Sequence, residues 1–298
     1  MKITRYFKTT TKGDILLDII KVLFLTFITV VTLYPFLNIL AISFNDATDA
    51  VRGGITIWPR VFSSASYAEI FRNRDFLNSI RVTVARTAIG TPISLLVTSM
   101  LAFALSRKEL VGRKGITLFF VFTMYFSGGM IPTFMVVRGL NLIDSFWVFI
   151  WPLALNVFNM ILIRTYIETL PESLIESAKL DGANDLRVFF QIVIPLIKPV
   201  LLTVGLFVAV LQWNSWFDAF IYTRNPNLRP MQSILVEILG QFQTAGQAQE
   251  RMLQTGATVT SDSIRMAATV VTALPIIMLY PLISKYVVKG MTLGAVKD

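Results

Sequence analysis

The sequence predicts an all-α protein that crosses a lipid bilayer six times, and three observations support this fold class. The chain has 298 residues, of which 54% are hydrophobic and only 15% are charged, whereas soluble domains carry about 25% charged residues. Its mean hydropathy is +0.66. Several apolar stretches reach the length of about 20 residues that a helix needs to cross the hydrocarbon core.

The composition also removes several classes of function. The chain contains no cysteine and no histidine, which excludes disulfides, thiol chemistry and typical zinc sites and removes the commonest general base near neutral pH. Its net charge of +9 is better explained by basic residues beside membrane spans than by binding to nucleic acid. The apolar run after Lys12 is too long for a cleaved signal peptide, so we expect it to be the first span.

Six apolar stretches are expected to form the spans. They cover residues 19–42, 80–105, 116–137, 146–166, 199–222 and 266–288. Prolines lie in or near several of them, and membrane helices tolerate proline where neighbouring groups satisfy the freed carbonyl. Because no internal repeat or separate soluble domain is evident, residues 1–298 are expected to form a single transmembrane domain.

The lysine positions predict the orientation of the chain. Every lysine lies near a terminus, in the connections 106–115 and 168–198, or at an adjoining helix end. None lies in the connections 43–79, 138–145 and 223–265. Since cytoplasmic loops are enriched in Lys and Arg, we expect a multi-pass protein of the inner or plasma membrane with both termini in the cytoplasm.

The connection 168–198 is predicted to hold two helices separated by a glycine. A proline followed by Glu172 is typical of a helix start, because proline fits the first turn and an acidic group there favours the helix dipole. Gly182 is expected to stop this helix, since glycine accepts backbone conformations that other residues resist. A second helix is predicted from about Asp185 and is expected to end before Pro195. An amphipathic loop lying on the membrane is the alternative interpretation.

The spacing of residues in this connection resembles the EAA loop of ABC importer permeases. The pattern is filled by Glu176, Ser177, Ala178, Gly182, Ile192, Ile194 and Pro195. It departs from the family in two places, with Ser177 where alanine is usual and Ile194 where leucine is usual. The segments 126–133, 213–217 and 288–297 are also similar to carbohydrate permeases of the LplC/YtcP type, relatives of the maltose-importer permeases.

This resemblance implies a type I ABC importer permease fold with a cytoplasmic coupling helix in the connection 168–198. It also implies a heterodimer with a second permease subunit, two ATP-binding subunits that carry ATP and Mg²⁺, and an extracytoplasmic sugar-binding protein. The chain has no Gly-x-x-x-x-Gly-Lys-Ser/Thr phosphate loop, so we expect a non-catalytic subunit that binds no cofactor itself. The residues expected to meet the ATPase are Glu172, Glu176, Ser177, Ala178, Asp181, Gly182, Ala183, Ile192 and Pro195.

The implied cargo is an oligosaccharide moved by alternating access, with polysaccharide-derived and uronic sugars among the candidates. Trp213, Asn214, Trp216 and Asp218 are candidates for its path at the outer end of the fifth span. Aromatic rings stack on the C–H faces of sugars, whereas amides and carboxylates bind sugar hydroxyls. An interfacial aromatic belt at a helix end is the alternative.

Polar residues inside two other spans are further candidates for the path. Asn156 and Asn159 are expected in the middle of the fourth span, where hydrogen bonds between helices are the favoured explanation and path lining is the alternative. Arg86 lies inside the second span, and we expect it to snorkel to the outer interface. The other interpretation is that Arg86 and Arg81 attract an anionic sugar.

The last outer connection contains a polar stretch that includes Thr244, Gly246, Gln247 and Gln249. It is interpreted either as a finger that contacts the sugar-binding protein or as a disordered connector. Two other classes of function compete with the importer. An ion-coupled secondary transporter usually hides acids within its spans, whereas the span centres here nearly lack them. A membrane-embedded hydrolase is disfavoured, because the chain lacks histidine and cysteine and shows no paired carboxylates at membrane depth.

Overall fold

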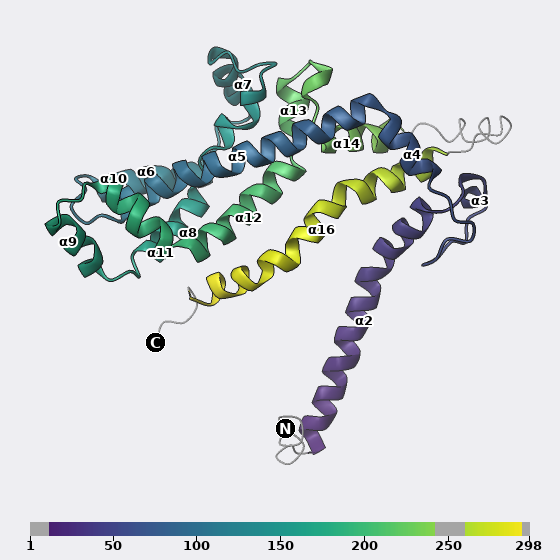
Figure 1. Ribbon diagram of the computed structural model, residues 1–298, viewed down its shortest axis with the longest axis horizontal. Helices are drawn as coiled ribbons and strands as arrows, with labels where there is room; N and C mark the ends of the chain where they lie inside the picture. The colour runs from purple at the N-terminus through teal and green to yellow at the C-terminus, as the bar shows by residue number, and fades with distance from the viewer. Residues whose placement is uncertain (1–11, 242–259, 294–298) are drawn as a thin grey trace. The chain divides into compact units, whose positions relative to one another are not determined.

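A computed structural model of the chain describes residues 12–241 and 260–293 (Figure 1). The described part is helical and contains no β-strand, apart from an isolated bridge between Asn45 and Phe62. This confirms the all-α fold class. The helices are α2 (Lys12–Ser43), α3 (Ala47–Val51), α4 (Ala65–Arg72), α5 (Arg74–Ser106), α6 (Arg113–Tyr125), α7 (Met130–Gly139), η1 (Phe146–Phe149), η2 (Trp151–Leu153), α8 (Val157–Ile167), α9 (Glu172–Leu180), α10 (Asp185–Val188), the π-helical segment η3 (Phe189–Val193), α11 (Ile194–Leu196), α12 (Lys198–Asn214), α13 (Phe217–Tyr222), η4 (Pro226–Leu228), α14 (Met231–Gln241) and α16 (Ser261–Leu293).

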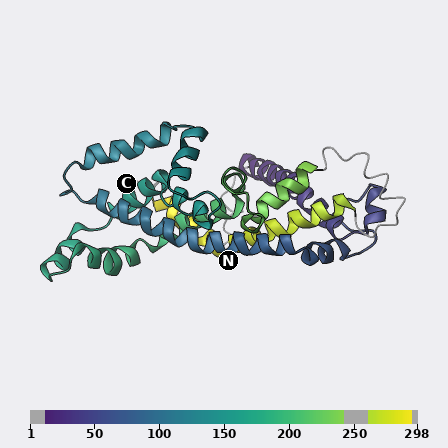
Figure 2. The same cartoon turned by 90° about the horizontal axis from the view of Figure 1, so that it is seen from above.

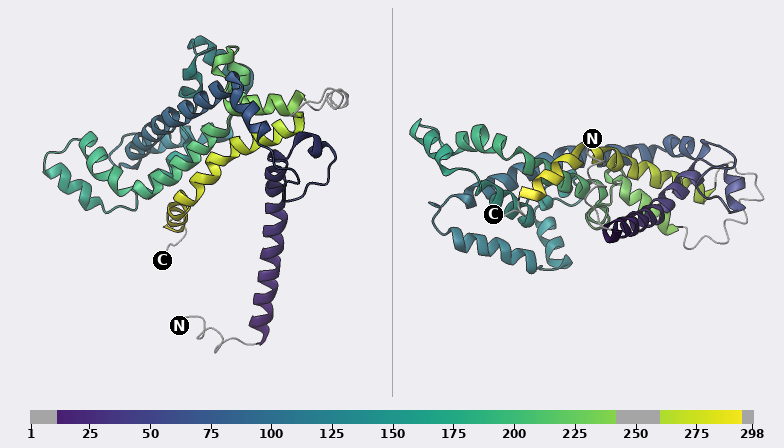
Figure 3. Two further views of the ribbon diagram at one scale, coloured as in Figure 1. Left: turned by 45° about the vertical axis from the view of Figure 1, so that its right-hand side comes forward. Right: turned by 90° about the horizontal axis from the view of Figure 1, so that it is seen from below.

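The contacts of the chain gather into two compact units. The first unit is Met1–Arg72 with Gln241–Val271, and the second is Asn73–Gly240 with Thr272–Asp298. In the first unit, α2 forms one continuous helix (purple in Figure 3) that is long and apolar enough to cross a membrane. The loop after α2 is held by the side chain of Asn45, whose Oδ1 accepts the backbone N–H groups of Arg60 and Val61 at 2.7 and 3.0 Å.

The core of the second unit lies among α5, α8 and α12, which run side by side (Figures 1 and 2). Each helix presents apolar residues three or four positions apart to this core, the spacing that puts side chains on one face of a helix. The buried residues are Ala102, Phe103 and Leu105 of α5, Met160, Ile163 and Ile167 of α8, and Val200, Val204 and Val208 of α12. The same cluster includes Ile175, Val188, Phe189, Val193 and Ile197, so the connection 168–198 is packed onto the end of the bundle.

Three of the predicted spans are single long helices. The first, second and sixth spans lie within α2, α5 and α16, and each of these helices holds a segment long and apolar enough to cross a membrane. The described residues give three such helices, or as many as six spans if each of three bent helix pairs counts as one. The count of six therefore stays a prediction.

The third and fourth predicted spans are broken, contrary to the continuous helices expected from hydropathy. The helices α6 and α7 meet at 118°, at a turn that ends with Gly129 in a left-handed conformation (φ 87°); Figure 2 shows this sharp turn in teal. The fourth stretch begins as the 3₁₀ turns η1 and η2 around Pro152 and continues as α8 after a bend of 49°. Glycine and proline interrupt these stretches because neither sustains a regular helix.

The fifth predicted span, 199–222, is also interrupted. The helix α12 ends at Asn214, and a separate short helix, α13, begins at Phe217. Before α12, the helical run Asp185–Leu196 meets the run Lys198–Asn214 at 84°. This earlier run also corrects a helix end, because it continues through Pro195 to Leu196 instead of ending before the proline. The wider π turn of η3 comes directly before Pro195, which has no N–H to donate within a regular α-helix.

Candidate functional site

The helix α9, which the sequence predicts to be the coupling helix, is anchored on one side and exposed on the other. Ile175 is buried in the core cluster, and Ala178 packs against the same cluster. The rest of the helix is exposed, including Glu176 and Ser177. At its end, Leu180 is 89% exposed. A large aliphatic side chain left in water at a helix end is a candidate contact for a partner surface.

The end of α9 forms a complete Schellman motif, as the predicted glycine stop requires. The backbone N–H of Gly182 donates to the carbonyl of Lys179 at 3.0 Å, and that of Ala183 donates to the carbonyl of Ala178 at 2.9 Å. Gly182 has φ 78°, and a Cβ placed on it would meet no atom within 4 Å. The glycine is therefore needed for its left-handed backbone and not for space.

The second half of the connection is packed more tightly. The side chain of Asn184 caps α10 by accepting the backbone N–H of Arg187 at 2.8 Å. Val188 and Phe189 are buried, whereas Ile192 is half-buried and Pro195 is exposed. The predicted coupling residues that lie on the exposed surface are Glu172, Glu176, Ser177, Asp181, Gly182 and Pro195. The connection thus presents most of α9 and its glycine turn outward and holds Val188, Phe189 and Val193 against the core.

Ion pairs join the coupling connection to the loop between α5 and α6. Lys108 donates to Glu172 at 2.6 Å, and this hydrogen bond raises the pKa of the lysine. Arg113 and Arg164 both pair with Glu168. Lys108 and Glu172 are 72% and 49% exposed, so water screens this pair and it can open without leaving a buried charge.

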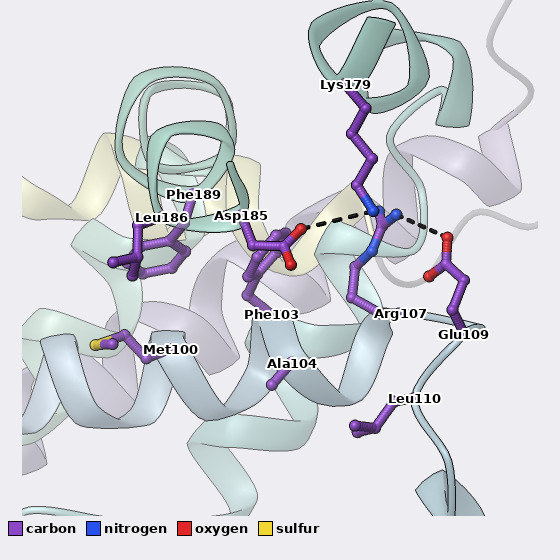
Figure 4. Close-up of a pocket in the computed structure, with 10 residues that line it drawn as sticks. All are labelled: Met100, Phe103, Ala104, Arg107, Glu109, Leu110, Lys179, Asp185, Leu186 and Phe189. Atoms are coloured by element: carbon purple, nitrogen blue, oxygen red, sulfur yellow. Dashed lines mark hydrogen bonds and ion pairs between the residues drawn. The ribbon is translucent and has the colours of Figure 1, made fainter. Parts of the chain in front are cut away.

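A cavity of about 410 Å³ lies behind the turn of residues 181–184 between α9 and α10, which is called the coupling turn below after its predicted role (Figure 4). Its lining residues are Met100, Phe103, Ala104, Arg107, Glu109, Leu110, Lys179, Asp185, Leu186 and Phe189. Two ion pairs, marked by dashed lines, stand at its rim: Lys179 with Asp185 at 3.6 Å and Arg107 with Glu109 at 3.1 Å. Because α9 and α10 do not fill the space over the end of α5, the turn has room to shift against the core.

Arg86 does not snorkel to an interface, contrary to expectation. It is 0% exposed and forms a two-pronged ion pair with Asp218, with guanidinium–carboxylate distances of 3.2 and 2.5 Å. It also donates to the carbonyl of Ser215 at 3.2 Å, and its Cζ lies 4.6 Å from the ring centroid of Phe149. A buried guanidinium needs such partners, because a lone charge is very costly away from water.

Gln212 completes the Arg86 cluster and was not identified from the sequence. It is 0% exposed, accepts from Arg86 Nε at 3.1 Å and donates from Nε2 to the carbonyl of Phe149 at 3.1 Å. Gly90 makes room for it, since a Cβ there would lie 2.6 Å from Gln212 Nε2. The signal available in the sequence was a single glutamine in an otherwise apolar span, which demands a polar partner.

The Arg86 cluster accounts for the break in the fifth stretch. Ser215, whose carbonyl accepts from Arg86, is the C-cap residue of α12, and Asp218 lies in the first turn of α13. A cation at the C-terminal end of one helix and an anion at the start of the next both favour the helix dipoles. The guanidinium therefore holds two short helices at an angle.

This break separates the residues predicted to share one helix. Trp213 and Asn214 belong to α12, whereas Trp216 and Asp218 belong to the turn and to α13. The indole N–H of Trp213 donates to the carbonyl of Thr272 at 3.0 Å, and Asn214 accepts from Gln232 at 3.0 Å. Asp218 is committed to Arg86. Trp216 lines a cavity that is described below.

The asparagines of the fourth stretch have a local role. Asn156 is not in mid-helix but is the N-cap of α8, where its side chain accepts the backbone N–H of Asn159 at 2.9 Å. This is the usual role of asparagine at a helix start. Asn159 is buried in the first turn of the same helix. The proposed contacts at Thr244, Gly246, Gln247 and Gln249 lie outside the described residues.

Comparison with known proteins identifies relatives along nearly the whole chain. None of the family models compared with it matches. The chain is 39% identical over 275 residues to the polygalacturonan/rhamnogalacturonan transport system permease protein YtcP of Bacillus subtilis, covering 92% of this chain and 96% of that protein. It is 37% identical to protein LplC of Bacillus subtilis, covering 96% and 97% of the two chains.

A solved structure has the same fold. The chain matches the crystal structure of a bacterial ABC transporter involved in the import of the acidic polysaccharide alginate, with a TM-score of 0.86, 29% identity and coverage of 93% and 98% of the two chains. Sequence and fold thus agree over almost the full length of both kinds of relative. The chain belongs to the family of permease subunits, the non-catalytic membrane components, of ABC importers for oligosaccharides and polysaccharides.

Proposed function

We propose that this chain moves an acidic oligosaccharide across the cell membrane by alternating access, driven by ATPase subunits that dock on α9 and its glycine turn. The observation that carries the docking proposal is the state of α9: Ile175 fixes the helix to the core, while Leu180 is 89% exposed. A helix held on one side and apolar at its free end is suited to insert into a partner's cleft.

The continuous, packed path from α9 to α12 supports the proposal that movement of α9 is transmitted into the bundle. The chain runs from α9 through α10, η3 and α11 into α12 without a long loop. Val188, Phe189, Val193 and Ile197 are all buried along this path. Because close-packed elements move as rigid bodies, a push on α9 is expected to reach α12, whose far end is fixed by Arg86.

The cargo proposal rests on the relatives. The relative that is 39% identical transports polygalacturonan and rhamnogalacturonan, and the structural relative imports alginate. Polygalacturonan is a chain of uronic acids, and alginate is an acidic polysaccharide. More distant permeases at 25% identity are named for arabinooligosaccharides. An acidic, polysaccharide-derived oligosaccharide is therefore the cargo that we propose for this chain.

The proposed assembly contains a second permease subunit, two ATP-binding subunits that hold ATP and Mg²⁺, and an extracytoplasmic sugar-binding protein. In it, residues 1–298 form one permease domain of six spans in the inner or plasma membrane, with both termini and the connection 168–198 in the cytoplasm. The ion-coupled transporter and the membrane hydrolase are set aside, because the family works with separate ATPase subunits and is itself non-catalytic.

The docking proposal is tested with Leu180→Ser. The tagged chain is pulled down from its native membranes in mild detergent, and the ATPase activity of the eluate is measured. The wild-type chain is expected to bring down a second permease and ATPase activity, and Leu180→Ser is expected to lose most of that activity while inserting normally.

Val111→Ser is the matched control, because Val111 is 91% exposed and lies in the neighbouring loop between α5 and α6. Its eluate should keep the wild-type ATPase activity. Full ATPase recovery with Leu180→Ser would overturn the docking site. A wild-type homo-oligomer without any ATPase would overturn the proposed assembly.

A further inference from the structure

A second cavity, of about 570 Å³, lies between α13 and α14 in the second unit. Its lining residues are Trp216, Ala219, Phe220, Thr223, Arg224, Arg229, Ser233, Val236 and Glu237. Small-molecule sites typically enclose about 300–1,000 Å³, so this cavity is large enough for a sugar unit. Of its lining residues, the sequence analysis singled out Trp216 as a candidate for the substrate path; it placed α13 in the fifth span and α14 in the outer connection, and so did not predict that they form one cavity.

The two walls are faces of two helices. Trp216, Ala219, Phe220 and Thr223 recur at the three- and four-residue spacing of one helix face on α13, and Ser233, Val236 and Glu237 do so on α14. The Ser233 hydroxyl donates to the carbonyl of Trp216 at 3.3 Å. The walls are thus tied together at one edge and stay apart over the cavity.

The start of α14 is fixed to the core, which keeps the cavity in shape. The buried backbone N–H of Met231 donates to Thr83 Oγ1 of α5 at 2.7 Å. Just before it, Asn78 donates to the carbonyl of Asn227 at 2.8 Å. A site held on both sides by rigid helices is already formed before a ligand binds, which lowers the entropic cost of binding.

One wall is an uncovered aromatic surface. The rings of Trp216 and Phe220 lie 6.2 Å apart, and Phe217 stacks on Phe220 with centroids 6.4 Å apart. Phe220 is 71% exposed. Aromatic rings next to polar groups suit ligands with one apolar and one polar side, and a sugar ring has both.

The lining of the cavity also carries three charged side chains. Arg229 pairs with Glu237 at 2.9 Å, so these two charges cancel. The guanidinium of Arg224 is exposed and forms no ion pair in the described part of the chain. The lining therefore carries a net charge of about +1, from two arginines and one glutamate. A carboxylate is the group that a guanidinium binds best, through two parallel hydrogen bonds.

The backbone at Arg224 is held in place by Asp144. Its carboxylate accepts the backbone N–H groups of Arg224 and Asn225, the second at 3.0 Å, and these bonds lower the pKa of Asp144. This carboxylate is engaged with the main chain and also attracts the guanidinium of Arg224, with which it forms no ion pair in the described part of the chain.

We propose that this cavity receives one uronic-acid unit of the incoming glycan. Arg224 binds the sugar carboxylate, Phe220 stacks on the C–H face of the ring, and Trp216, whose ring is tilted by 60° to that of Phe220, contacts the edge of the sugar. Glu237 with the Ser233 and Thr223 hydroxyls binds its hydroxyl groups. The inference rests on the proposed function, since it assigns a site to the acidic cargo proposed above.

The test is uptake of trigalacturonate by the complete importer, with its binding protein and ATPases, in proteoliposomes. Arg224→Gln is expected to raise the KM for trigalacturonate by about tenfold or more, because a charge-assisted pair is lost, and to leave the maximal rate near wild type. Arg224→Lys should restore part of the affinity. Arg138→Gln is the matched control, because Arg138 is an exposed arginine on α7 outside this cavity.

The outcomes separate this site from the cargo proposal. If the wild-type importer took up trigalacturonate and Arg224→Gln did so with an unchanged KM, the site alone would be overturned. A lower maximal rate without a change in KM would do the same, because it would mark a structural role. If the wild-type importer took up neutral arabinotriose but no uronic-acid trimer, the acidic cargo would be overturned and this site with it.

Discussion

The surroundings of α9 and the Arg86 cluster hold their charges in opposite ways, although both lie in the second unit. At the start of α9, Glu172 pairs with Lys108 of the loop between α5 and α6, and these side chains are 49% and 72% exposed. In the cluster, Arg86 is 0% and Asp218 only 14% exposed. The exposed pair can exchange its partner for water at small cost. The buried pair cannot, because one unpaired charge would remain away from water.

This difference in exposure fits two roles: the region around α9 is proposed to change partners, whereas the Arg86 cluster is expected to keep its shape. The coupling turn is proposed to contact other subunits, and its ion pairs can open and re-form. The cluster determines the angle between α12 and α13 with four hydrogen bonds from one guanidinium. We therefore expect substitutions in the cluster to affect stability strongly and those at the turn to affect it weakly.

The largest effect on stability is expected for Asp218→Ala. Removing the carboxylate leaves the guanidinium of Arg86 buried without its counter-charge, and breaking a buried pair costs about 3–5 kcal/mol. The melting temperature of the detergent-purified importer should fall by several degrees. The double variant Arg86→Met/Asp218→Leu should recover most of this loss, since it buries no charge.

Glu172→Ala is the control for Asp218→Ala, because it removes one partner of an exposed pair. It should melt close to wild type. If Asp218→Ala melted like Glu172→Ala, the buried cluster would not be the rigid part of the molecule, and the contrast between the two regions would disappear.

A smaller loss is expected for Gly90→Ala. The new methyl group would lie 2.6 Å from Gln212 Nε2 and 3.2 Å from Ile150 Cδ1, and overpacking of this kind costs about 1–3 kcal/mol. Thermal melting measures the loss. Gly115→Ala is the matched control, since a methyl group at Gly115 in α6 meets nothing within 4 Å.

Coupling between positions 90 and 212 gives this prediction a second check. With Gln212 shortened to serine, Gly90→Ala should be less harmful than in the wild-type background, because the clash is with the glutamine side chain. Equal losses in both backgrounds would contradict tight packing at this position.

The same comparison explains what the sequence could predict. The connection 168–198 is local: its helix start, glycine stop and second helix depend on residues within a few positions of each other, and the Schellman bonds join residues at most five positions apart. Spacing along the chain therefore identified Gly182 and the faces of α9. The pairing of Arg86 with Asp218 joins residues 132 positions apart, and no local pattern encodes it.

Hydropathy located the membrane stretches but not their breaks. An apolar window records composition, whereas the direction of the chain changes at single residues such as Gly129 and Asn156. Asparagine ahead of a helix and paired glycines are helix-boundary signals, so these two breaks were readable in principle. The break after Asn214 was not, because it depends on the distant Arg86.

For the stability of the turn after α9, the backbone of Gly182 should matter more than the exposed side chains there. Gly182→Val is expected to cost about 1–2 kcal/mol, because a residue with a Cβ resists the left-handed conformation at φ 78°. Gly182→Asn should cost less, because asparagine tolerates this region. Thermal melting measures stability, and ATPase recovery in the pull-down measures docking.

The pair of variants separates backbone from surface effects. If valine and asparagine reduced ATPase recovery equally, the side chain at this position would block docking, whatever the backbone conformation. If valine alone reduced it, the Schellman turn itself would be what the ATPase subunits recognise. Equal recovery for both and for wild type would remove Gly182 from the docking site.

The smallest effect is expected for Lys108→Gln, which removes the exposed pair with Glu172. The hydrogen bond from Lys108 to Glu172 raises the pKa of the lysine above its usual value of 10.5. The contribution of the pair is therefore fully present below that value and is lost only as the pH rises through the raised pKa. From roughly pH 6 to 9, wild type and Lys108→Gln should differ by a small, constant shift in melting temperature that shrinks as salt is added. A difference that changed steeply within this range would mean that the pair senses another titrating group, and the coupling turn would then share the tight electrostatic coupling of the Arg86 cluster.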